Sequence, residues 1–491
     1  MPTLLYRLFK PNLIGESGQQ AKSRFAIKEQ QLLFLIMLAS SILIAACIDE
    51  GHNWGGDFSL YIAQTKALVN GSLSELYAAN KFSMDNSIEI LGPYLYPCGF
   101  PLLLAPVYLL FGMNFMVMKG FCGLFFILSL PLIYQLFKAH FPNKFFVFFI
   151  IIFIAFNAIY ITFADAVLSD LPFFFFSVLS IYLMGRGNTL FNQALLGICI
   201  FFSYFIRDVG IVLLPTLFVF QVQMALFRRS EVKNWAFWAI PYLVFAIGFL
   251  LNFYLLPRGG QNHITIFLSN LTPGKIFTNT IVYLKQTDSF FINGIVPDNL
   301  LFIKLAPIPI LVAIGMLARW REYSYLTAYL ALTFSILVVW PFLTLRFLFP
   351  LVPFFLFFMM QGLLFVSEKV KLKQQYLVWG LSLYLVVFAA VNGIEAVRYS
   401  KEDTNAIFTP EMSRIYGYIQ EHIPQGQVIG FNKPRVLRLI TGVNSIGIDE
   451  NSFEASPAQY LIIEKDQYSG RTNRYDKIFE TSNYLILEKP Q

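Results

Sequence analysis

Charged residues are scarce in this chain. Only 13% of the 491 residues are Asp, Glu, Lys or Arg, whereas 57% are hydrophobic and 17% are aromatic. An ordinary soluble domain carries about 25% charged residues. The shortage excludes a soluble protein of this size, and the mean hydropathy of +0.61 predicts an integral membrane protein that crosses the bilayer several times.

Cysteine is scarce as well. The four cysteines, Cys47, Cys98, Cys122 and Cys199, are dispersed and lie mostly in apolar runs. This pattern offers neither the ligand spacing of a metal site nor a disulfide framework. The net charge of +7 does not indicate nucleic-acid binding, because the basic residues lie in short tracts between apolar runs, as in cytoplasmic loops.

Long apolar runs, in contrast, are abundant. About eleven are long enough to cross the roughly 30 Å of a bilayer core, so the expected fold is mainly α, a polytopic transmembrane helical bundle. The first run lacks a small-residue cleavage site and is expected to be a retained signal anchor. The segments are 31–49, 115–137, 145–164, 168–184, 191–206, 209–226, 235–256, 299–318, 323–341, 347–366 and 375–394.

The apolar segment 99–111 is short and contains Pro101 and Pro106. Its length fits a buried or re-entrant helix better than a crossing. The positive-inside rule favours this interpretation. With a cytoplasmic N-terminus and no crossing at 99–111, the later basic tracts all fall inside, whereas a crossing would move them outside. These tracts contain Lys138, Lys144, Arg186, Arg228, Arg229, Lys233, Arg319, Arg321, Lys369, Lys371 and Lys373.

This topology places the loops 50–114, 164–168, 206–209, 257–298 and 341–346 on one external face. Loops at one end of a helical bundle can converge, even when they are far apart in the sequence. We therefore expect several acids and arginines of these loops to line a single interfacial pocket. They are Asp57, Asp165, Asp170, Arg207, Asp208 and Arg346.

Three regions follow from the topology. Residues 1–30 are expected to form a cytoplasmic N-terminal segment, residues 31–394 the transmembrane domain, and the polar residues 395–491 a small external α/β domain. In the last region, Thr409-Pro-Glu is a typical helix start, and a second helix is expected from Lys433-Pro to Gly442. Strands are expected at 427–431, 460–463 and 484–487.

Asp57 follows the first apolar run in the sequence Trp54-Gly-Gly-Asp and precedes the amphipathic stretch 58–69. An ionisable side chain at the edge of a membrane segment is costly unless it serves a function, so Asp57 is a candidate catalytic residue. The alternative is structural, because Asp57 could cap the helix that follows, as Asp often does. The sequence leaves both interpretations open.

Four stretches carry a family resemblance. They begin at Gly55 (GGDFSLYI), Tyr96 (YPCGFPLLLAPVYLLFG), Ala164 (ADAVLSDLPFF) and Arg346 (RFLFPLVP). Together they resemble the GT-C superfamily of polyprenyl-phosphate-sugar glycosyltransferases. This superfamily includes protein O-mannosyltransferases, lipid A aminoarabinose transferases and bacterial family 39-type proteins.

The second stretch is close to the family's YPPGYPLLLAPLY, and the fourth is similar to its RYLLPLLP. One departure is Cys98, where the family usually has a second proline. The resemblance in order and spacing covers residues 31 to about 366, and the segment 424–445 also looks like the tail of many bacterial members.

The resemblance implies an inverting glycosyltransferase. Its donor would be a polyprenyl-phosphate sugar, and its acceptor a hydroxyl of a lipid, a glycan or a protein. The protein is expected to be a multi-pass protein of the bacterial inner (cytoplasmic) membrane, with its active site and C-terminal domain facing the periplasm or exterior. The family's first-loop acid takes the proton of the acceptor, and Asp57 holds that position. Asp170 or Asp165 would be the second-loop acid, and Asp170 is nearer to the family's placement.

Arginine suits a leaving phosphate, because a guanidinium can donate two parallel hydrogen bonds. Arg346 and Arg207 are the candidates on the external face, and Lys81 in the first loop is a third. Each has a structural alternative. Arg346 could be a snorkelling anchor, Arg207 could pair with Asp208, and Lys81 could belong to a solvated loop surface.

The sequence indicates no cofactor apart from a divalent cation. His52 lies near Asp49 and Glu50, and oxygen-rich ligands would suit Mg²⁺ or Mn²⁺, although much of the superfamily acts without metal. Membrane lipids are expected partners, and nucleic acid is not. The alternative function is a transporter or lipid-carrier flippase without transferase activity. That function predicts inverted repeats and binding groups near mid-membrane, whereas the polar residues here gather at one face.

Overall fold

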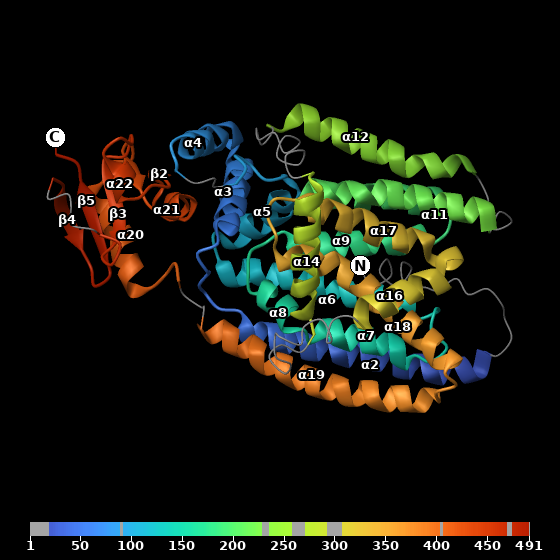
Figure 1. Cartoon of the computed structure of the whole chain (residues 1–491). Helices are drawn as coiled ribbons and strands as arrows, with labels where there is room; N and C mark the ends of the chain where they lie inside the picture. Colours follow the sequence, from blue (N-terminus) through green and yellow to red (C-terminus); the bar gives the residue numbers. More distant parts are fainter. Residues whose placement is uncertain are drawn as a thin grey trace.

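The computed structural model describes residues 19–88, 92–227, 235–257, 271–291, 307–402, 406–468 and 474–490. A long helical bundle makes up most of the molecule. A smaller α/β domain lies beyond one end of the bundle, next to the helices that follow the first span (Figure 1).

Seven helices in the described residues are long and apolar enough to cross a membrane, or eight if one bent pair counts as a span. The pair is α7 (Phe145–Ala155) and α8 (Ala158–Ala164), which meet at 47°. The seven comprise α2 (Gln19–Cys47), α6 (Phe115–Phe137), η1 (Asp208–Val212) with α11 (Leu213–Phe227), η3 (Trp235–Ala239) with α12 (Ile240–Leu255), α17 (Trp320–Val339), η5 (Leu345–Leu351) with α18 (Val352–Lys369), and α19 (Gln374–Glu402).

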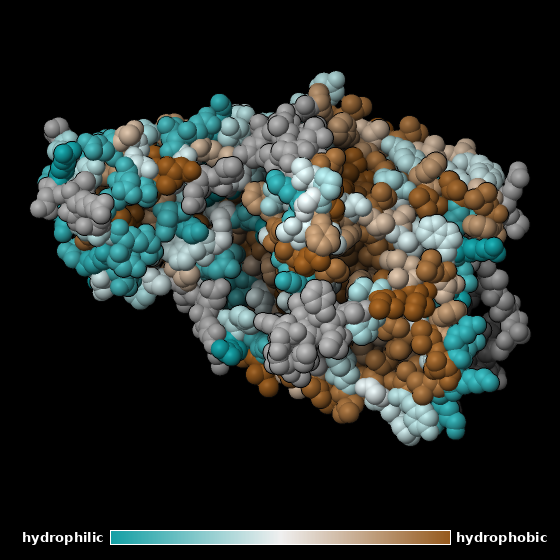
Figure 2. Space-filling model, viewed as in Figure 1, coloured by the Kyte–Doolittle hydropathy of each residue, from teal (hydrophilic) through white to brown (hydrophobic). Residues whose placement is uncertain are grey.

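Apolar side chains cover the visible bundle surface, whereas the α/β domain is mostly hydrophilic (Figure 2). On α12, for example, Leu243, Ile247 and Leu251 are all exposed. A helix that is apolar on its outer face is stable in lipid rather than in water. The fold class predicted from the sequence, a polytopic helical bundle with a small C-terminal α/β domain, is confirmed.

Four apolar helices are shorter than an ordinary span. Three of them, α9 (Asp170–Met184), α10 (Leu190–Ile206) and α16 (Pro307–Ala318), fall where crossings are expected, and residues 292–306 before α16 are outside the described part. The fourth is α5 (Gly99–Phe111), whose 13 residues reach only about 20 Å at 1.5 Å per residue. That length agrees with the expected non-crossing helix.

Two helices, α3 (Gly56–Asn70) and α4 (Leu73–Asp85), cap the end of the bundle that faces the α/β domain (Figure 1). The turn between them is made by Gly71, whose φ of 70° is left-handed and ends α3. One face of α3 packs on α5, where Phe58 and Phe100 are fully buried in one cluster.

In the described part of the expected external loop 257–298, residues 273–288 form helix α14 (Pro273–Asp288). The Asn279 amide donates to the Val338 carbonyl at 2.7 Å, and the Gln286 amide donates to the Leu343 carbonyl at 3.2 Å. These bonds tie α14 to the segment just before η5.

The α/β domain is built on a five-stranded sheet in the order β2-β1-β3-β5-β4. Strand β1 runs parallel to β2 and β3, while β5 runs antiparallel to β3 and β4. Gly430 pairs with Leu461, which in turn pairs with Leu487. The elements are α20 (Pro410–His422), β1 (Val428–Gly430), α21 (Pro434–Thr441), β2 (Asn444–Ile446), α22 (Glu450–Phe453), β3 (Tyr460–Glu464), β4 (Asp476–Glu480) and β5 (Tyr484–Glu488).

Both helices expected in this domain are present. Thr409 caps α20 by accepting a hydrogen bond from the Met412 amide at 3.1 Å, and α21 ends at Gly442 with a φ of 78°. The three expected strands correspond to β1, β3 and β5. Strands β2 and β4 were not expected, because β2 has three residues and β4 is a partly charged edge strand. Helix α19 continues to Glu402, past the expected boundary at residue 394.

Candidate active site

Four charged side chains meet at the end of the bundle that faces the α/β domain. Arg346 Nη2 donates to Asp57 Oδ2, and Arg207 Nη1 donates to Asp170 Oδ1. Arg346 Nη1 also lies 3.7 Å from Asp170 Oδ2. We call these four residues the central cluster. Arg346 links its two acids, so the cluster holds two negative and two positive charges.

The helix arrangement explains how Asp170 and Arg207 meet. Helices α9 and α10 pack against each other and form an antiparallel hairpin. Helix α9 begins at Asp170 and α10 ends at Ile206, so the start of one lies beside the end of the other. Arg207 has extended backbone (φ −149°, ψ 130°), which ends α10 and leads into η1.

Arg346 and Asp57 come from other elements. Arg346 is the second residue of η5, which packs on α9, and Asp57 is in the first turn of α3. The side chain of Asp170 is only 2% exposed, whereas those of Asp57, Arg346 and Arg207 are 27%, 20% and 17% exposed. A substrate can therefore reach one acid and both arginines, while Asp170 supports them from behind.

An aromatic ring supports both guanidinium groups. The Phe347 ring centre lies 4.9 Å from the Arg207 guanidinium carbon and 5.6 Å from that of Arg346. Cations at such distances are attracted to the negative face of the ring. Phe347 thus contributes to holding the two positive charges next to each other.

Asp57 has a second partner that sequence reasoning missed. The Tyr96 hydroxyl donates to Asp57 Oδ1 at 2.6 Å. Gln64 fixes the backbone of Tyr96 by accepting from its N–H and donating to its C=O, both at 2.9 Å. Tyr61 stacks on the Tyr96 ring with centroids 4.7 Å apart. Tyr96 is the first residue of the second motif, so the sequence marked this position but did not reveal the role of the side chain.

Neither acid is the N-cap of the helix in which it lies, so the capping alternative for Asp57 does not fit the geometry. Helix α3 has Gly55 at its N-cap, and the Asp57 carboxylate contacts Arg346 and Tyr96. Helix α9 has Ser169 at its N-cap, and Asp170 is the first helical residue, paired with arginine.

The surroundings of Asp57 favour its ionised form. Burial alone would raise the pKa of this carboxyl, but the Arg346 charge, the hydrogen bonds from Tyr96 and Arg346, and the Arg207 charge outweigh burial. The pKa of Asp57 is consequently below its ordinary value, and the carboxylate is ionised at neutral pH.

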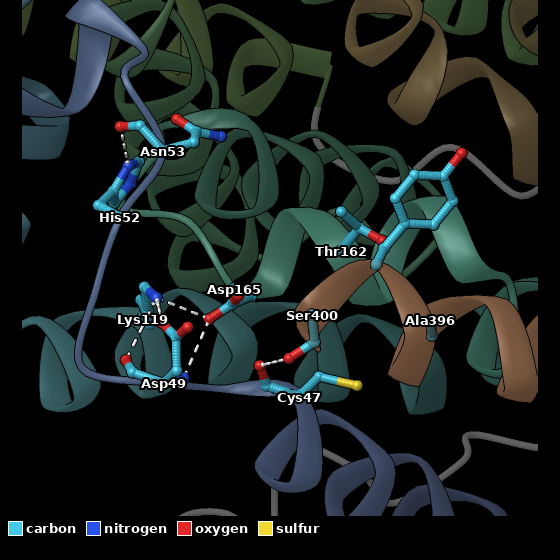
Figure 3. Close-up of a pocket in the computed structure, with 10 residues that line it drawn as sticks. Cys47, Asp49, His52, Asn53, Lys119, Thr162, Asp165, Ala396 and Ser400 are labelled. Carbon is cyan, nitrogen blue, oxygen red and sulfur yellow. Dashed lines mark hydrogen bonds and ion pairs between the residues drawn. The ribbon is translucent and has the colours of Figure 1, made fainter. Parts of the chain in front are cut away.

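Asp165 belongs to a different ion-pair network. The nearly inaccessible Lys119 ammonium lies 2.6 Å from Asp49 Oδ1 and 2.8 Å from Asp165 Oδ1 (Figure 3). These groups line a pocket together with Cys47 and Ser400. Burial, with a contribution from Asp49, raises the pKa of Asp165 to about 6 despite Lys119. Of the two acids proposed for the second external loop, only Asp170 is in the central cluster.

The residues proposed for a divalent cation do not form a ligand set. His52 Nε2 accepts a hydrogen bond from the Val167 N–H at 3.1 Å, while Nδ1 lies 3.1 Å from the Asn53 carbonyl. Burial lowers the pKa of His52 to about 4, so the imidazole is neutral. Asp49 is already paired with Lys119. Within the described residues, no group of three or more His, Cys, Asp or Glu could hold a metal ion.

Lys81 lies on α4 and has its ion pair on that helix rather than in the central cluster. Its ammonium is 3.4 Å from Asp85 Oδ2, one turn later, and both side chains are about half exposed. Among the described residues Lys81 makes no ion pair with the central cluster. The geometry matches the solvated loop surface that was its structural alternative.

Comparisons with known proteins agree on the fold. No family model and no curated protein matches this sequence. ArnT from Cupriavidus metallidurans in the apo state superposes with a TM-score of 0.59 at 12% identity, over 94% of this chain and 100% of ArnT. ArnT bound to undecaprenyl phosphate gives a TM-score of 0.61 at 11% identity, over 94% and 99%.

AglB from Archaeoglobus fulgidus, in complex with an inhibitory peptide and a dolichol-phosphate, gives a TM-score of 0.53 at 11% identity, over 89% of this chain and 70% of AglB. ArnT and AglB are GT-C superfamily glycosyltransferases. The fold of this chain is the GT-C fold. The resemblance drawn from the four motifs is confirmed at this level, and the GT-C fold covers nearly the whole chain.

Proposed function

We propose that this protein is an inverting glycosyltransferase that uses a polyprenyl-phosphate sugar and glycosylates a hydroxyl acceptor at the outer face of the bacterial inner membrane. The observation that carries the proposal is the central cluster. It places one reachable, ionised carboxylate beside two reachable guanidinium groups at the end of a GT-C bundle.

Asp57 is the general base of the proposed reaction. The acceptor oxygen attacks the anomeric carbon from the face opposite the phosphate, and its proton passes to the Asp57 carboxylate. The bond from the anomeric carbon to the phosphate oxygen breaks, and its electron pair leaves with the polyprenyl phosphate. A positioned base contributes about 10²–10⁴-fold to such a step.

Arg346 and Arg207 are proposed to bind the departing phosphate. Fixed cations at the position where negative charge develops stabilise the transition state, and guanidinium groups match phosphate oxygens bidentately. In the structure Arg346 is paired with Asp57. When a phosphate engages Arg346, part of that pairing is exchanged, which frees a lone pair of Asp57 for the acceptor proton.

The similar structures support a lipid-linked donor. One ArnT structure contains undecaprenyl phosphate, and one AglB structure contains a dolichol-phosphate with an inhibitory peptide. In this chain α5, which begins three residues after Tyr96, exposes Leu102, Leu109 and Leu110, an apolar surface that suits an isoprenoid tail. The sugar, and whether the acceptor is a lipid, a glycan or a protein, are questions for experiment.

The proposed orientation rests on the charges of the loops. Arg186 and Arg319 follow α9 and α16, and Lys369 is the last residue of α18; all three lie at helix ends away from the central cluster. Excess positive charge is retained on the cytoplasmic side. The central cluster and the α/β domain would then face the periplasm or exterior.

Lipid analysis of a strain that lacks the gene tests this proposal. We expect the strain to lack a glycan modification and to accumulate a polyprenyl-phosphate sugar. The wild-type gene should reverse both changes, and Asp57→Asn should reverse neither. A transporter or flippase does not catalyse the transfer itself, so in that case Asp57→Asn should restore the glycan as the wild-type gene does. An unchanged glycan profile in the deletion strain would refute the proposal.

A further inference from the structure

The α/β domain is docked directly on the helices that carry the candidate base. Helix α21 packs on α3, and β2 packs on α4. The Ile88 N–H donates to the Gly447 carbonyl at 2.9 Å, and the Gly447 N–H donates to Ser87 Oγ at 2.7 Å. Ser83 Oγ donates to the Ser445 carbonyl at 2.6 Å. Backbone groups on both sides take part, so the docking position is well defined.

One charged residue of this interface faces the active site. Arg435, in the first turn of α21, is only 7% exposed. Its Nη2 donates to the Pro93 carbonyl at 2.6 Å, and its guanidinium interacts electrostatically with Tyr96 and Asp57. Gly92 lies beside this pair and has a φ of 93°, which L side chains rarely adopt; a Cβ there would be in van der Waals contact with Arg435 Nη1 at 3.4 Å and with the Tyr96 hydroxyl at 3.6 Å.

Tyr96 lies between Arg435 and Asp57. Burial, and then the negative charge of Asp57, raise the pKa of the Tyr96 hydroxyl well above its ordinary value, while Arg435 opposes the rise. The hydroxyl therefore stays protonated and donates a hydrogen bond to Asp57 Oδ1. A cation on the oxygen side of such a hydroxyl polarises it and strengthens the bond that it donates.

Arg435 also changes the charge of the site. The central cluster is neutral, with two acids and two arginines. Arg435 adds one positive charge close to Asp57. The phosphodiester of a polyprenyl-phosphate sugar carries one negative charge, so the bundle alone offers a neutral site and the docked α/β domain makes it complementary to the donor.

We infer that Arg435 is a positioning residue that acts through Tyr96 to orient the Asp57 carboxylate, so that the α/β domain completes the active site. This inference rests on the proposed function and assigns the α/β domain a part in it. The domain contributes no group to the reacting atoms; it fixes the group that does.

The test compares Arg435→Met with a matched control, Arg438→Gln. Arg438 lies on the same helix and donates to Asn80 Oδ1 on α4, so the control loses a docking contact without the link to Tyr96. Sugar transfer is measured in membranes of the complemented deletion strain as a function of pH. Tyr96→Phe and the double variant complete the cycle.

We expect Arg435→Met to lower transfer about 10- to 100-fold, since small misplacements of a reacting group have effects of this size. The acid limb of the pH profile should move to higher pH, because a cation near Asp57 is lost. In the Tyr96→Phe background, Arg435→Met should add little. Arg435→Lys should restore part of the loss. Equal losses in Arg435→Met and Arg438→Gln, with an unmoved acid limb, would overturn the inference.

The groups that face Asp57 from all neighbouring elements enter this pH argument. They are Asp170 on α9, Arg207 after α10, Arg346 on η5, Tyr96 before α5, Tyr61 on α3 and Arg435 on α21. Within the described residues, all of them except Arg435 belong to the bundle and its first loop, so Arg435 is the group through which the α/β domain acts.

A second measurement does not require activity. In a cryo-EM structure of full-length Arg435→Met, we expect the Tyr96 hydroxyl to have left Asp57, while Arg438→Gln keeps that contact. If Tyr96 stays on Asp57 without Arg435, the inference is wrong whatever the transfer rates. If instead Asp57→Asn transfers sugar normally, the proposed function fails, and the cryo-EM result still decides the positioning role.

Discussion

Replacing Asp57 by Asn removes the proposed base and leaves its surroundings nearly intact. Asn can still accept the hydrogen bond from Tyr96, because its amide oxygen can take the place of Asp57 Oδ1. Arg346 loses one partner but keeps Asp170 at 3.7 Å. A hydrogen bond to a charged group is worth about 1.5–3 kcal/mol, so the variant should fold with a modest loss of stability.

The catalytic effect should be much larger than the effect on folding. A general base contributes about 10²–10⁴-fold, which corresponds to about 2.7–5.4 kcal/mol in the barrier. Binding of undecaprenyl phosphate should change in the opposite direction. Removing one negative charge next to Arg346 raises the net positive charge of the site by one, so purified Asp57→Asn should bind this probe more tightly than the wild type.

The assay pairs transfer in membranes with undecaprenyl phosphate binding to the purified full-length protein. Asp165→Asn is the matched control, because Asp165 is the same residue type in the separate Lys119 network. We expect the control to retain transfer. Transfer by Asp57→Asn within tenfold of the wild type, or weakened binding together with lost transfer, would refute the assignment of Asp57 as the base.

The pH profile gives an independent check. The pKa of Asp57 is lowered in the folded protein, so the carboxylate stays ionised as pH falls until it passes below the ordinary value of about 3.9. Transfer should therefore lose no activity from Asp57 between about pH 5 and pH 8. The pKa of Asp165 in the wild type is about 6, so Asp165→Asn removes that titration. An acid limb near pH 6 that persists in Asp165→Asn would contradict the proposed role of Asp57.

Two further substitutions test the fold. Lys119→Met leaves Asp49 and Asp165 as close acids without their shared cation. Because removing one partner of a buried ion pair costs about 3–5 kcal/mol, we expect a lower thermal-unfolding midpoint. A midpoint equal to that of Asp165→Asn would contradict this. Gly362→Ala would place a Cβ 1.9 Å from the Leu311 carbonyl oxygen, so α16 and α18 must separate. We expect overpacking to cost about 1–3 kcal/mol, measured as a lower midpoint, and an unchanged midpoint would show that the helices adapt freely.

The spans could be predicted because the length of an apolar run is a local property. The run 115–137 coincides with α6, and the segment 99–111 coincides with α5. The break between α7 and α8 was not expected. It lies at Asn157, whose side chain caps α8 and donates to the Phe290 carbonyl at 2.7 Å. That contact involves a residue far along the chain, which periodicity cannot reveal.

The central cluster was only partly predictable. Topology and motifs placed Asp57, Asp170, Arg207 and Arg346 at one end of the bundle, but neither gives side-chain directions. Asp165 and Asp170 lie in the same short connection, and their separation depends on the residue at which α9 begins. Because Asp170 is the first residue of α9, it faces the end of α10, whereas Asp165 lies before this start and turns towards Lys119.

The role of Arg435 could not be found by sequence reasoning for a different reason. Arg435 lies 342 residues after Pro93, whose carbonyl it binds. The contact depends on how two separately folded surfaces dock, and no local propensity encodes that docking. A basic residue at the start of α21 gives no signal by itself. Lys433, two residues before Arg435, is also basic but is exposed.

Short helices explain why these charges are effective where they lie. Helices α9 and α10 have 15 and 17 residues, so they reach only about 22–26 Å in a bilayer core of about 30 Å. Arg186, in the turn between them, marks the surface at which the hairpin starts. In the proposed orientation, Asp170 and Arg207 at the opposite ends lie below the other surface, where charges interact more strongly than in water. The phosphate of the proposed lipid-linked donor would meet them at that depth, and the acceptor hydroxyl would approach Asp57 from the aqueous side.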